Sequence, residues 1–161
     1  MERGREAEQV ISALRCRGLT LAVAESCTGG LVGKLITDSP GSSKVFLGGV
    51  VAYSDQVKVG MLDVPPGVIR NHGAVSAQTA LSMADGVRKA IGADVGISCT
   101  GIAGPEGGTE LKPVGLVCMA VSGLDDSMVE VLLFKGDRDR IRKSSAQHLL
   151  GMLGEFMEGK L

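Results

Sequence analysis

The sequence predicts an α/β protein, organised as a single three-layer domain with a mixed, mostly parallel sheet flanked by helices. Short apolar runs alternate with segments of helical periodicity, which is typical of parallel strands joined by helices. The runs at residues 19–24 and 94–99 each lead into a glycine-containing turn, as the strands of open α/β sheets often do. Two later runs are separated only by residues 123–127, which indicates a hairpin and therefore an antiparallel portion of the sheet.

The length and composition are consistent with this architecture. A chain of 161 residues fits one domain over residues 1–161, and it should bury about 70% of its unfolded surface. With three Phe, one Tyr and no Trp, the core must be mainly aliphatic. No segment reads as a linker, so we expect no second domain.

Charge and cysteine usage exclude several classes of function. The formal net charge is −1 with no long basic run, and aromatic residues are scarce, so nucleic acid is not expected as a partner. No run reaches the ~18 apolar residues that span a bilayer, and no export signal precedes the first helix, so we expect no membrane partner and a cytoplasmic protein. A metal site is not expected, because only two histidines accompany four cysteines without a CxxC pair, and we expect those cysteines as free thiols: Cys16, Cys27, Cys99 and Cys118.

The first third of the chain reads as helix, strand, turn and helix. Residues 6–17 place apolar side chains on one helical face, and Gly18 is suited to ending that helix. Residues 19–24 form an apolar strand, and a polar turn at residues 25–30 leads into a helix at residues 31–36. The composition of residues 37–43 predicts a loop.

A second apolar run covers residues 45–53, and its paired glycines, Gly48 and Gly49, indicate a bulge or a close backbone approach. Ser54 or Asp55 then caps a short helix that continues through Met61. Residues 63–75 are polar and contain proline, so we expect mostly loop there.

Ser76 begins the clearest helix of the chain, which ends at Gly92 and is followed by the strand at residues 94–99. Residues 100–108 form a second glycine-rich turn. The hairpin strands at residues 114–122 and 128–134 precede the last helix, which follows residues 136–140 and is amphipathic. The arginines near its start can be a solvated face, or one of them can bind a phosphate.

The turn at residues 25–30 is the first candidate for chemistry. Ser26, Cys27 and Thr28 place two hydroxyls and a thiol at a helix start, where Gly29 and Gly30 leave backbone N–H groups open to a ligand. Such a turn can present a nucleophile and bind an anion. Alternatively, Ser26 or Thr28 only caps the helix, and the glycines only permit close packing.

Lys58 lies in the first turn of the short predicted helix, where a cation faces the positive end of the macrodipole, which disfavours its charged form. The alternative is an exposed Lys58 paired with Asp55. No histidine is close to Ser26 in sequence, although the fold could bring His72 or His148 near it. The second glycine-rich turn, with Thr100, Gly101 and Gly104, offers further N–H groups for an anion or oxyanion.

Six blocks of sequence together resemble one known family. The blocks are Ala24-Glu-Ser-Cys-Thr-Gly-Gly30, Gly49-Val-Val-Ala-Tyr-Ser54 with Lys58, His72-Gly-Ala-Val-Ser76, Thr100-Gly-Ile-Ala-Gly-Pro105, Lys112-Pro-Val-Gly115 and Gly136-Asp-Arg138. They occur in the same order over nearly the whole chain. The chain therefore resembles the nicotinamide-nucleotide amidase family, also called the carboxy-terminal domain of competence-damage-inducible proteins.

The resemblance implies an amidohydrolase that converts nicotinamide mononucleotide, a small nucleotide substrate, to nicotinate mononucleotide and ammonia, with no metal or redox cofactor. By position, Ser26 matches the family's nucleophile, Lys58 its base and Tyr53 the tyrosine beside them. Thr28, Gly29, Gly30, Thr100, Gly101, Gly104 and Arg138 are the expected substrate-binding residues. The chain departs from the family at Asp55, where relatives usually have Asn, and a carboxylate facing Lys58 would raise the pKa of that lysine.

Two other functions are compatible with the same residues. Cys27 can be the nucleophile, since a thiolate at a helix N-terminus is readily activated. The domain can also be a non-catalytic nucleotide- or phosphate-binding regulatory module, in which Ser26 and Thr28 only bind phosphate. A homo-oligomer is compatible with the sequence in each case.

Overall fold

The computed structural model describes residues 5–160, and it confirms a single α/β domain built on a mixed sheet. The five strands are β1 (Leu21–Glu25), β2 (Phe46–Val51), β3 (Val95–Gly101), β4 (Leu116–Ser122) and β5 (Ser127–Leu133). Their order in the sheet is β2-β1-β3-β4-β5. Strands β2, β1 and β3 are parallel, while β4 and β5 add antiparallel to β3 as the predicted hairpin.

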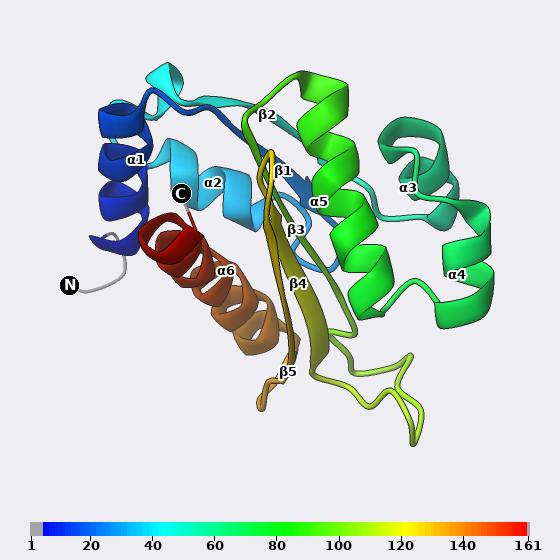
Figure 1. The fold of residues 1–161 in the computed structure, drawn as a ribbon. Coiled ribbons are helices and arrows are strands. Elements are labelled where there is room, and N and C mark those ends of the chain that lie inside the picture. The colour runs from blue at the N-terminus through cyan, green and yellow to red at the C-terminus, as the bar shows by residue number, and fades with distance from the viewer. Residues whose placement is uncertain (1–4, 161) are drawn as a thin grey trace.

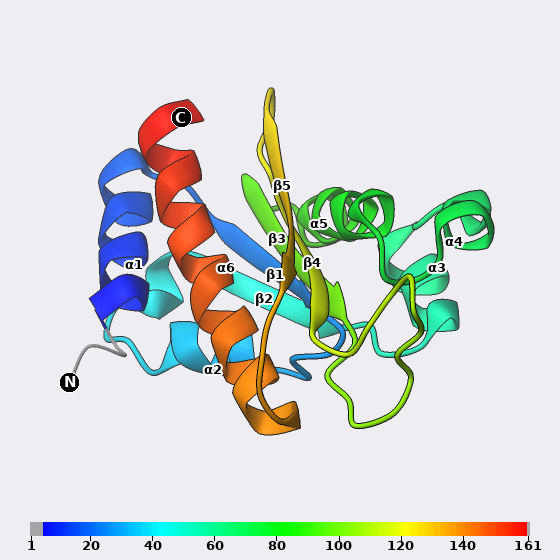
Figure 2. The ribbon, with the colours of Figure 1, turned by 90° about the horizontal axis from the view of Figure 1, so that it is seen from below.

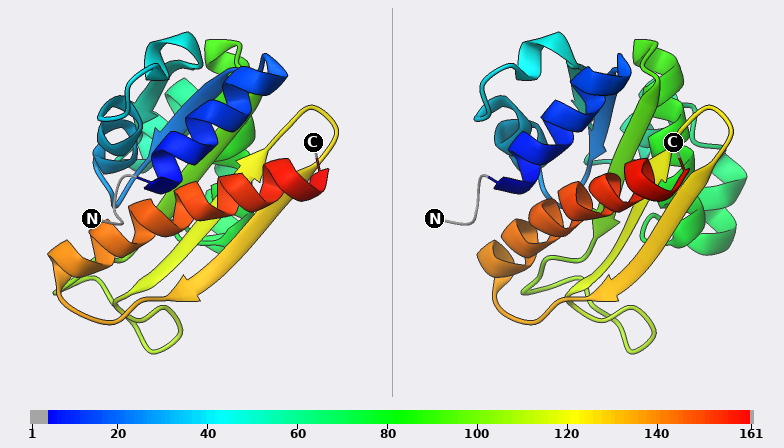
Figure 3. Two further views of the ribbon diagram at one scale, coloured as in Figure 1. Left: turned by 90° about the vertical axis from the view of Figure 1, so that its left-hand side faces the viewer. Right: turned by 60° about the vertical axis from the view of Figure 1, so that its left-hand side comes forward.

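Helices cover both faces of the sheet, which gives the predicted three layers (Figures 1 and 2). One face carries α1 (Arg5–Arg17), α2 (Leu31–Thr37) and the long α6 (Arg138–Lys160). The other face carries α3 (Asp55–Leu62), α4 (Pro66–His72) and α5 (Ala77–Ile91). Figure 3 shows α6 running diagonally across its face beside α1. The sheet is therefore shielded from water where its parallel strands are most apolar.

The core is mainly aliphatic, as the composition predicts. All five residues of β1 are buried, because this strand lies inside the sheet and is covered on both faces. The larger buried cluster lies under α1, α2 and α6 and includes Phe156, while α5 packs Met83 and Val87 against the opposite face.

Most predicted element ends lie close to the observed ones. Ser54 and Ser76 are N-caps whose hydroxyls accept from the amides of Val57 and Thr79, and Gly92 ends α5 in the left-handed region. The register between β1 and β2 shifts near Gly48, which confirms the predicted irregularity. Strand β1 begins two residues later than predicted, because the Thr20 amide and hydroxyl bind the Asp94 carboxylate instead.

Two segments predicted as loop contain helix. Residues 63–75 include α4, whose start is explained by Pro66: its fixed φ and missing N–H suit the first turn of a helix. Residues 37–43 run into a short 3₁₀ helix, Ser42–Lys44. In both segments, proline or glycine residues that favour loop stand at the start of a short helix.

The packing of α5 on α3 leads to a stability prediction at Gly86. A methyl group there would lie 1.9 Å from the Leu62 carbonyl oxygen, a backbone atom that cannot move aside by rotating a side chain. We expect Gly86→Ala to lower the free energy of unfolding by about 2 kcal/mol or more, measured by urea denaturation. The matched control is Gly151→Ala in α6, which has open space and should be neutral or raise stability by up to about 1 kcal/mol. Equal effects of the two substitutions would contradict this packing argument.

Candidate active site

The three parallel strands bring the predicted site residues to one edge of the sheet. Ser26 directly follows β1, Tyr53 and Lys58 follow β2, and Thr100 lies at the end of β3. Strand β1 lies between β2 and β3 in the sheet. The connection from β1 to β2 contains α2 on one face, and the connection from β2 to β3 contains α5 on the other face (Figure 1). Ligand sites of open α/β sheets form at such a switch point, at the carboxyl ends of the strands.

A cavity of about 290 Å³ opens at this edge. Of the ten predicted site residues, seven line it: Ser26, Tyr53, Lys58, Thr100, Gly101, Gly104 and Arg138. Cys27, Asp55 and Glu106 also contribute to its wall. The sequence blocks that lie far apart in the chain therefore form one site, with the nucleophile candidate and the base candidate in the same cavity.

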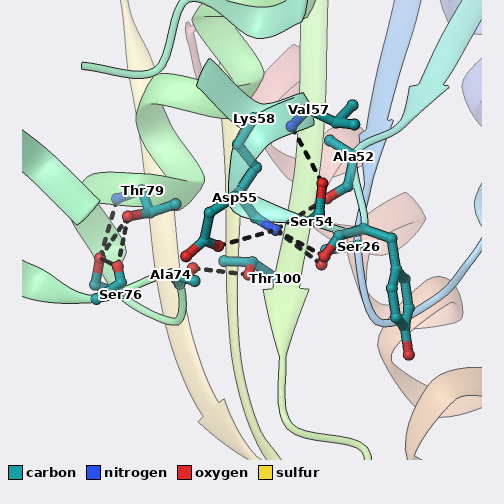
Figure 4. Close-up of polar contacts among 12 residues, drawn as sticks. Ser26, Ala52, Ser54, Asp55, Val57, Lys58, Ala74, Ser76, Thr79 and Thr100 are labelled. Carbon is teal, nitrogen blue, oxygen red and sulfur yellow. Dashed lines mark hydrogen bonds and ion pairs between the residues drawn. The ribbon is translucent and has the colours of Figure 1, made fainter. Parts of the chain in front are cut away.

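Lys58 projects inward from α3 and is only 1% exposed. Its Nζ lies 3.2 Å from Ser26 Oγ, and it donates to the carbonyl oxygens of Ala52 at 2.9 Å and Tyr53 at 3.3 Å. Figure 4 shows this side chain between Asp55 and Ser26. The structure excludes the exposed-lysine alternative, although Asp55 Oδ1 does lie 4.0 Å from Nζ.

Burial controls the charge of Lys58. Removing the amine from water disfavours the ammonium form and lowers the pKa of Lys58 below its ordinary value of 10.5. The Asp55 carboxylate opposes this shift, and Cys27 opposes it further, but desolvation is the largest effect. A lysine with a lowered pKa, within hydrogen-bond distance of a serine hydroxyl, is chemically suited to act as a general base.

Glu25 is a site residue that the sequence analysis did not select. Its side chain is 2% exposed, and its carboxylate accepts from the amides of Gly30, Val32 and Gly33 at 2.9, 3.1 and 2.8 Å. These are N–H groups at the start of α2, so Glu25 caps that helix from the end of β1. The position of Ser26 follows from this cap, because Ser26 is the next residue. The signal available in the sequence was a carboxylate immediately before a glycine-containing helix start.

The glycine turn therefore differs from its prediction. The residue at the N-cap of α2 is Gly30, and neither Ser26 nor Thr28 caps the helix. The Gly30 amide is bound to Glu25, and the buried Thr28 hydroxyl lies 2.9 Å from Cys99 Sγ. Thr28, Gly29 and Gly30 are absent from the residues that line the cavity, within the chain described. Three amides at the start of α2 are thus bound to the protein's own Glu25 carboxylate.

Arginines of α6 hold the site from the side opposite α3. Arg142 donates to the carbonyl oxygens of Cys27 at 3.0 Å and Thr28 at 2.9 Å, so it anchors the turn that carries Ser26. Arg138 donates to the Gly104 carbonyl at 2.7 Å and to the Tyr53 hydroxyl at 3.2 Å. Arg138 and Arg140 are exposed, as predicted for most of the arginines near the start of this helix, whereas Arg142 is half-buried against the turn.

Tyr53 belongs to the cavity wall, and its hydroxyl contacts Arg138. Only its backbone carbonyl contacts Lys58. The ring is largely exposed, with 61% of the residue's surface accessible. Tyr53 therefore exposes its ring at the cavity wall, while its hydroxyl is held by Arg138.

The other nucleophile and base candidates are differently placed. Cys27 is 5% exposed, and a hydrogen bond from Cys99 lowers its pKa, with burial acting in the opposite direction. The contact that distinguishes Ser26 is its hydrogen bond with Lys58. His148 pairs with Glu130 at 2.6 Å, away from the site, and neither histidine lines the cavity in the described chain.

The described residues offer little for a metal or a membrane. From residue 5 to residue 160, no group of three or more His, Cys, Asp or Glu side chains is arranged to hold a metal ion. Over the same range, no helix has the length and apolar character needed to cross a bilayer. All four cysteines are free.

Comparison with known proteins gives consistent matches over nearly the whole chain. Residues 4–157 match the model of the CinA C-terminal domain. A CinA-like protein of Desulfotalea psychrophila is 52% identical over 145 residues, which is 90% of this chain and 35% of that protein. A CinA-like protein of Myxococcus xanthus is 50% identical over 149 residues, covering 92% and 35%. The chain thus spans about a third of the length of these relatives.

Solved structures give the same result. The competence/damage inducible protein CihA of Agrobacterium tumefaciens is 37% identical, with a TM-score of 0.92 over 95% of this chain and 94% of that one. The competence damage-inducible protein A of Klebsiella pneumoniae is 30% identical, with a TM-score of 0.95 over 99% of each chain.

The Glu25 cap leads to a prediction about stability. Glu25→Gln keeps the shape of the side chain but replaces one acceptor oxygen by an NH₂ group, so buried N–H groups of α2 lose a charged partner. We expect the free energy of unfolding to fall by about 2–4 kcal/mol, measured by urea denaturation. The matched control is Asp38→Asn at the other end of α2, whose exposed carboxylate pairs with Lys34 and should contribute less than about 0.5 kcal/mol. A loss of similar size in both variants would contradict the cap.

Proposed function

Since the chain belongs to the CinA C-terminal domain family, we propose that it is an amidohydrolase acting on nicotinamide mononucleotide through Ser26 and Lys58. One observation carries the proposal: a lysine amine, 1% exposed, lies 3.2 Å from a serine hydroxyl inside a cavity at the switch point of the sheet. A surface lysine would be protonated and could not accept the serine proton. Burial lowers the pKa of Lys58, so the neutral amine forms at lower pH than it would on a surface lysine.

In the proposed reaction, neutral Lys58 accepts the proton of Ser26 as Oγ attacks the carboxamide carbon. The resulting ammonium then donates that proton to the amide nitrogen, the C–N bond breaks, and ammonia leaves. Ser26 is left as an ester of the nicotinate group. Water, deprotonated by Lys58, attacks this ester, the bond to Ser26 Oγ breaks, and Lys58 returns the proton to Oγ as nicotinate mononucleotide leaves.

The remaining cavity residues supply binding. Arg138 has no carboxylate partner within residues 5–160, so its guanidinium can bind the phosphate of the nucleotide while it still contacts Gly104 and Tyr53. The amides at the start of α2 are bound to Glu25, and the Ile102 amide donates to the Leu116 carbonyl, so we assign stabilisation of the oxyanion to the backbone amides of Ala103 and Gly104, which line the cavity. The Thr100 hydroxyl holds this segment by donating to the Ala74 carbonyl at 2.8 Å.

The identity of the nucleophile is tested by two substitutions. We expect Ser26→Ala to abolish ammonia release from nicotinamide mononucleotide, because the hydroxyl forms the covalent bond. Cys27→Ala should retain a substantial fraction of wild-type kcat/KM, because the thiol does not react. The reverse result would make Cys27 the nucleophile, and no ammonia release from the wild type would favour a non-catalytic nucleotide-binding module.

The role of Lys58 is tested by pH. The active form carries a neutral amine, so kcat/KM should rise with pH through the pKa of Lys58, and this limb should lie below the ordinary 10.5 because burial lowers that pKa. Lys58→Arg should be nearly inactive, because a guanidinium does not give up its proton. Lys143→Arg is the matched control, since Lys143 is an exposed lysine of α6 paired with Asp139. Wild-type activity in Lys58→Arg would rule out Lys58 as the base.

A further inference from the structure

The cavity carries negative charge close to the nucleophile. Asp55 Oδ1 lies 4.0 Å from Lys58 Nζ, which in turn lies 3.2 Å from Ser26 Oγ, so the carboxylate is no farther from the nucleophile than these two distances combined. Asp55 lines the cavity and its side chain is 60% exposed, so its carboxylate is accessible to a ligand. Within residues 5–160, its one ion pair is with Lys58.

This carboxylate loses its partner charge in the active form. The reaction proposed above requires neutral Lys58, and a neutral amine leaves Asp55 without a compensating cation beside the reacting atoms. Glu106 adds a second carboxylate to the cavity wall, and it has no ion pair within the described residues. Arg138 provides positive charge in the same cavity and forms its hydrogen bonds with neutral groups, the Gly104 carbonyl and the Tyr53 hydroxyl.

We infer that Asp55 makes the cavity selective for carboxamides attached to a cationic ring, and that it does so by pairing with the positive charge of the ring. The inference rests on the proposed amidase function. When Ser26 Oγ is in position to attack the carboxamide carbon, the ring bonded to that carbon must lie within the same short range that contains Asp55. A neutral ring of the same shape gains nothing from the carboxylate, so Asp55 is a specificity residue as well as a helix-start residue.

The position of Asp55 also has a purely structural explanation, and the two can be separated. Asp55 is the first residue of α3, where a carboxylate interacts favourably with the helix dipole. That contribution changes the stability of the protein equally, whichever ligand is present. The change that Asp55→Asn makes in the ratio of affinities for a ligand with a cationic ring and one with a neutral ring therefore isolates the specificity role.

The test compares nicotinamide mononucleotide with its reduced form, in which the dihydropyridine ring is neutral while the carboxamide, ribose and phosphate are unchanged. Dissociation constants are measured by calorimetry in Ser26→Ala, so that the first compound is not consumed. We expect tighter binding of the cationic compound, and we expect Asp55→Asn in that background to reduce this preference by about fivefold at low salt. The preference should also fall as ionic strength rises, because the carboxylate is exposed.

Asp63→Asn is the matched control, because Asp63 follows the last residue of the same helix and the change in charge is identical. Its left-handed backbone conformation, with φ of 52°, is one that Asn tolerates, and it should leave the preference unchanged. An unchanged preference in Asp55→Asn, or an equal change in Asp63→Asn, would overturn the inference. Ammonia release by the wild type together with that result would leave the amidase proposal standing, whereas failure to bind nicotinamide mononucleotide would remove both.

Discussion

The site depends on the burial of one amine. Lys58 extends from α3 into the region between β1 and β2, where two backbone carbonyl groups and the Ser26 hydroxyl are its hydrogen-bond partners. Burying an ammonium without a buried carboxylate is costly, so the folded protein favours the neutral amine. The same burial that costs stability lowers the pKa of Lys58, as the proposed role of general base requires. The rest of the cavity is built around keeping this side chain in place.

Glu25 fixes the orientation of Ser26, the proposed nucleophile, because the two residues are adjacent in the chain. Its buried carboxylate binds three amides of α2 and fixes the turn between β1 and that helix. Arg142 binds two carbonyl groups of the same turn from α6. Charged side chains thus hold both sides of the turn, and the Ser26 hydroxyl is positioned without taking part in the cap.

Two different parts of the domain can bind negatively charged groups: the start of α2 binds the Glu25 carboxylate, and Arg138 is free of carboxylate partners within residues 5–160. The helix start nearest Ser26 is capped internally by Glu25, so in the proposed reaction the substrate phosphate binds at another part of the cavity. Arg138 is available for this, because its partners there are neutral groups on the 104 segment and on Tyr53. A nucleotide that carries a phosphate at one end and a positive ring at the other fits a cavity with Arg138, Asp55 and Glu106 in its wall. The charged residues of the cavity therefore support the proposed substrate as much as the cavity's position in the fold does.

Local patterns in the sequence determined the architecture. The apolar runs and helical periodicities predicted every strand and most helices, because burial of one face imposes a fixed spacing on any sequence. The caps at Ser54, Ser76 and Gly92 were also predictable, since each acts within one turn of chain. The missed helix α4 shows the limit of such signals, because its prolines resemble those of a loop.

Only the tertiary structure decided which polar groups meet. The sequence placed Lys58 near a helix start but could not indicate whether it was buried or exposed, since that depends on how α3 packs against the sheet. It left the start of α2 open to a ligand or to a cap by Ser26 or Thr28, whereas in the folded chain the Glu25 carboxylate binds these amides. It left the arginines of α6 open, although Arg142 lies more than a hundred residues from the turn it binds. Contacts of such long range are set by the crossing of strands and helices in space, and no local spacing encodes them.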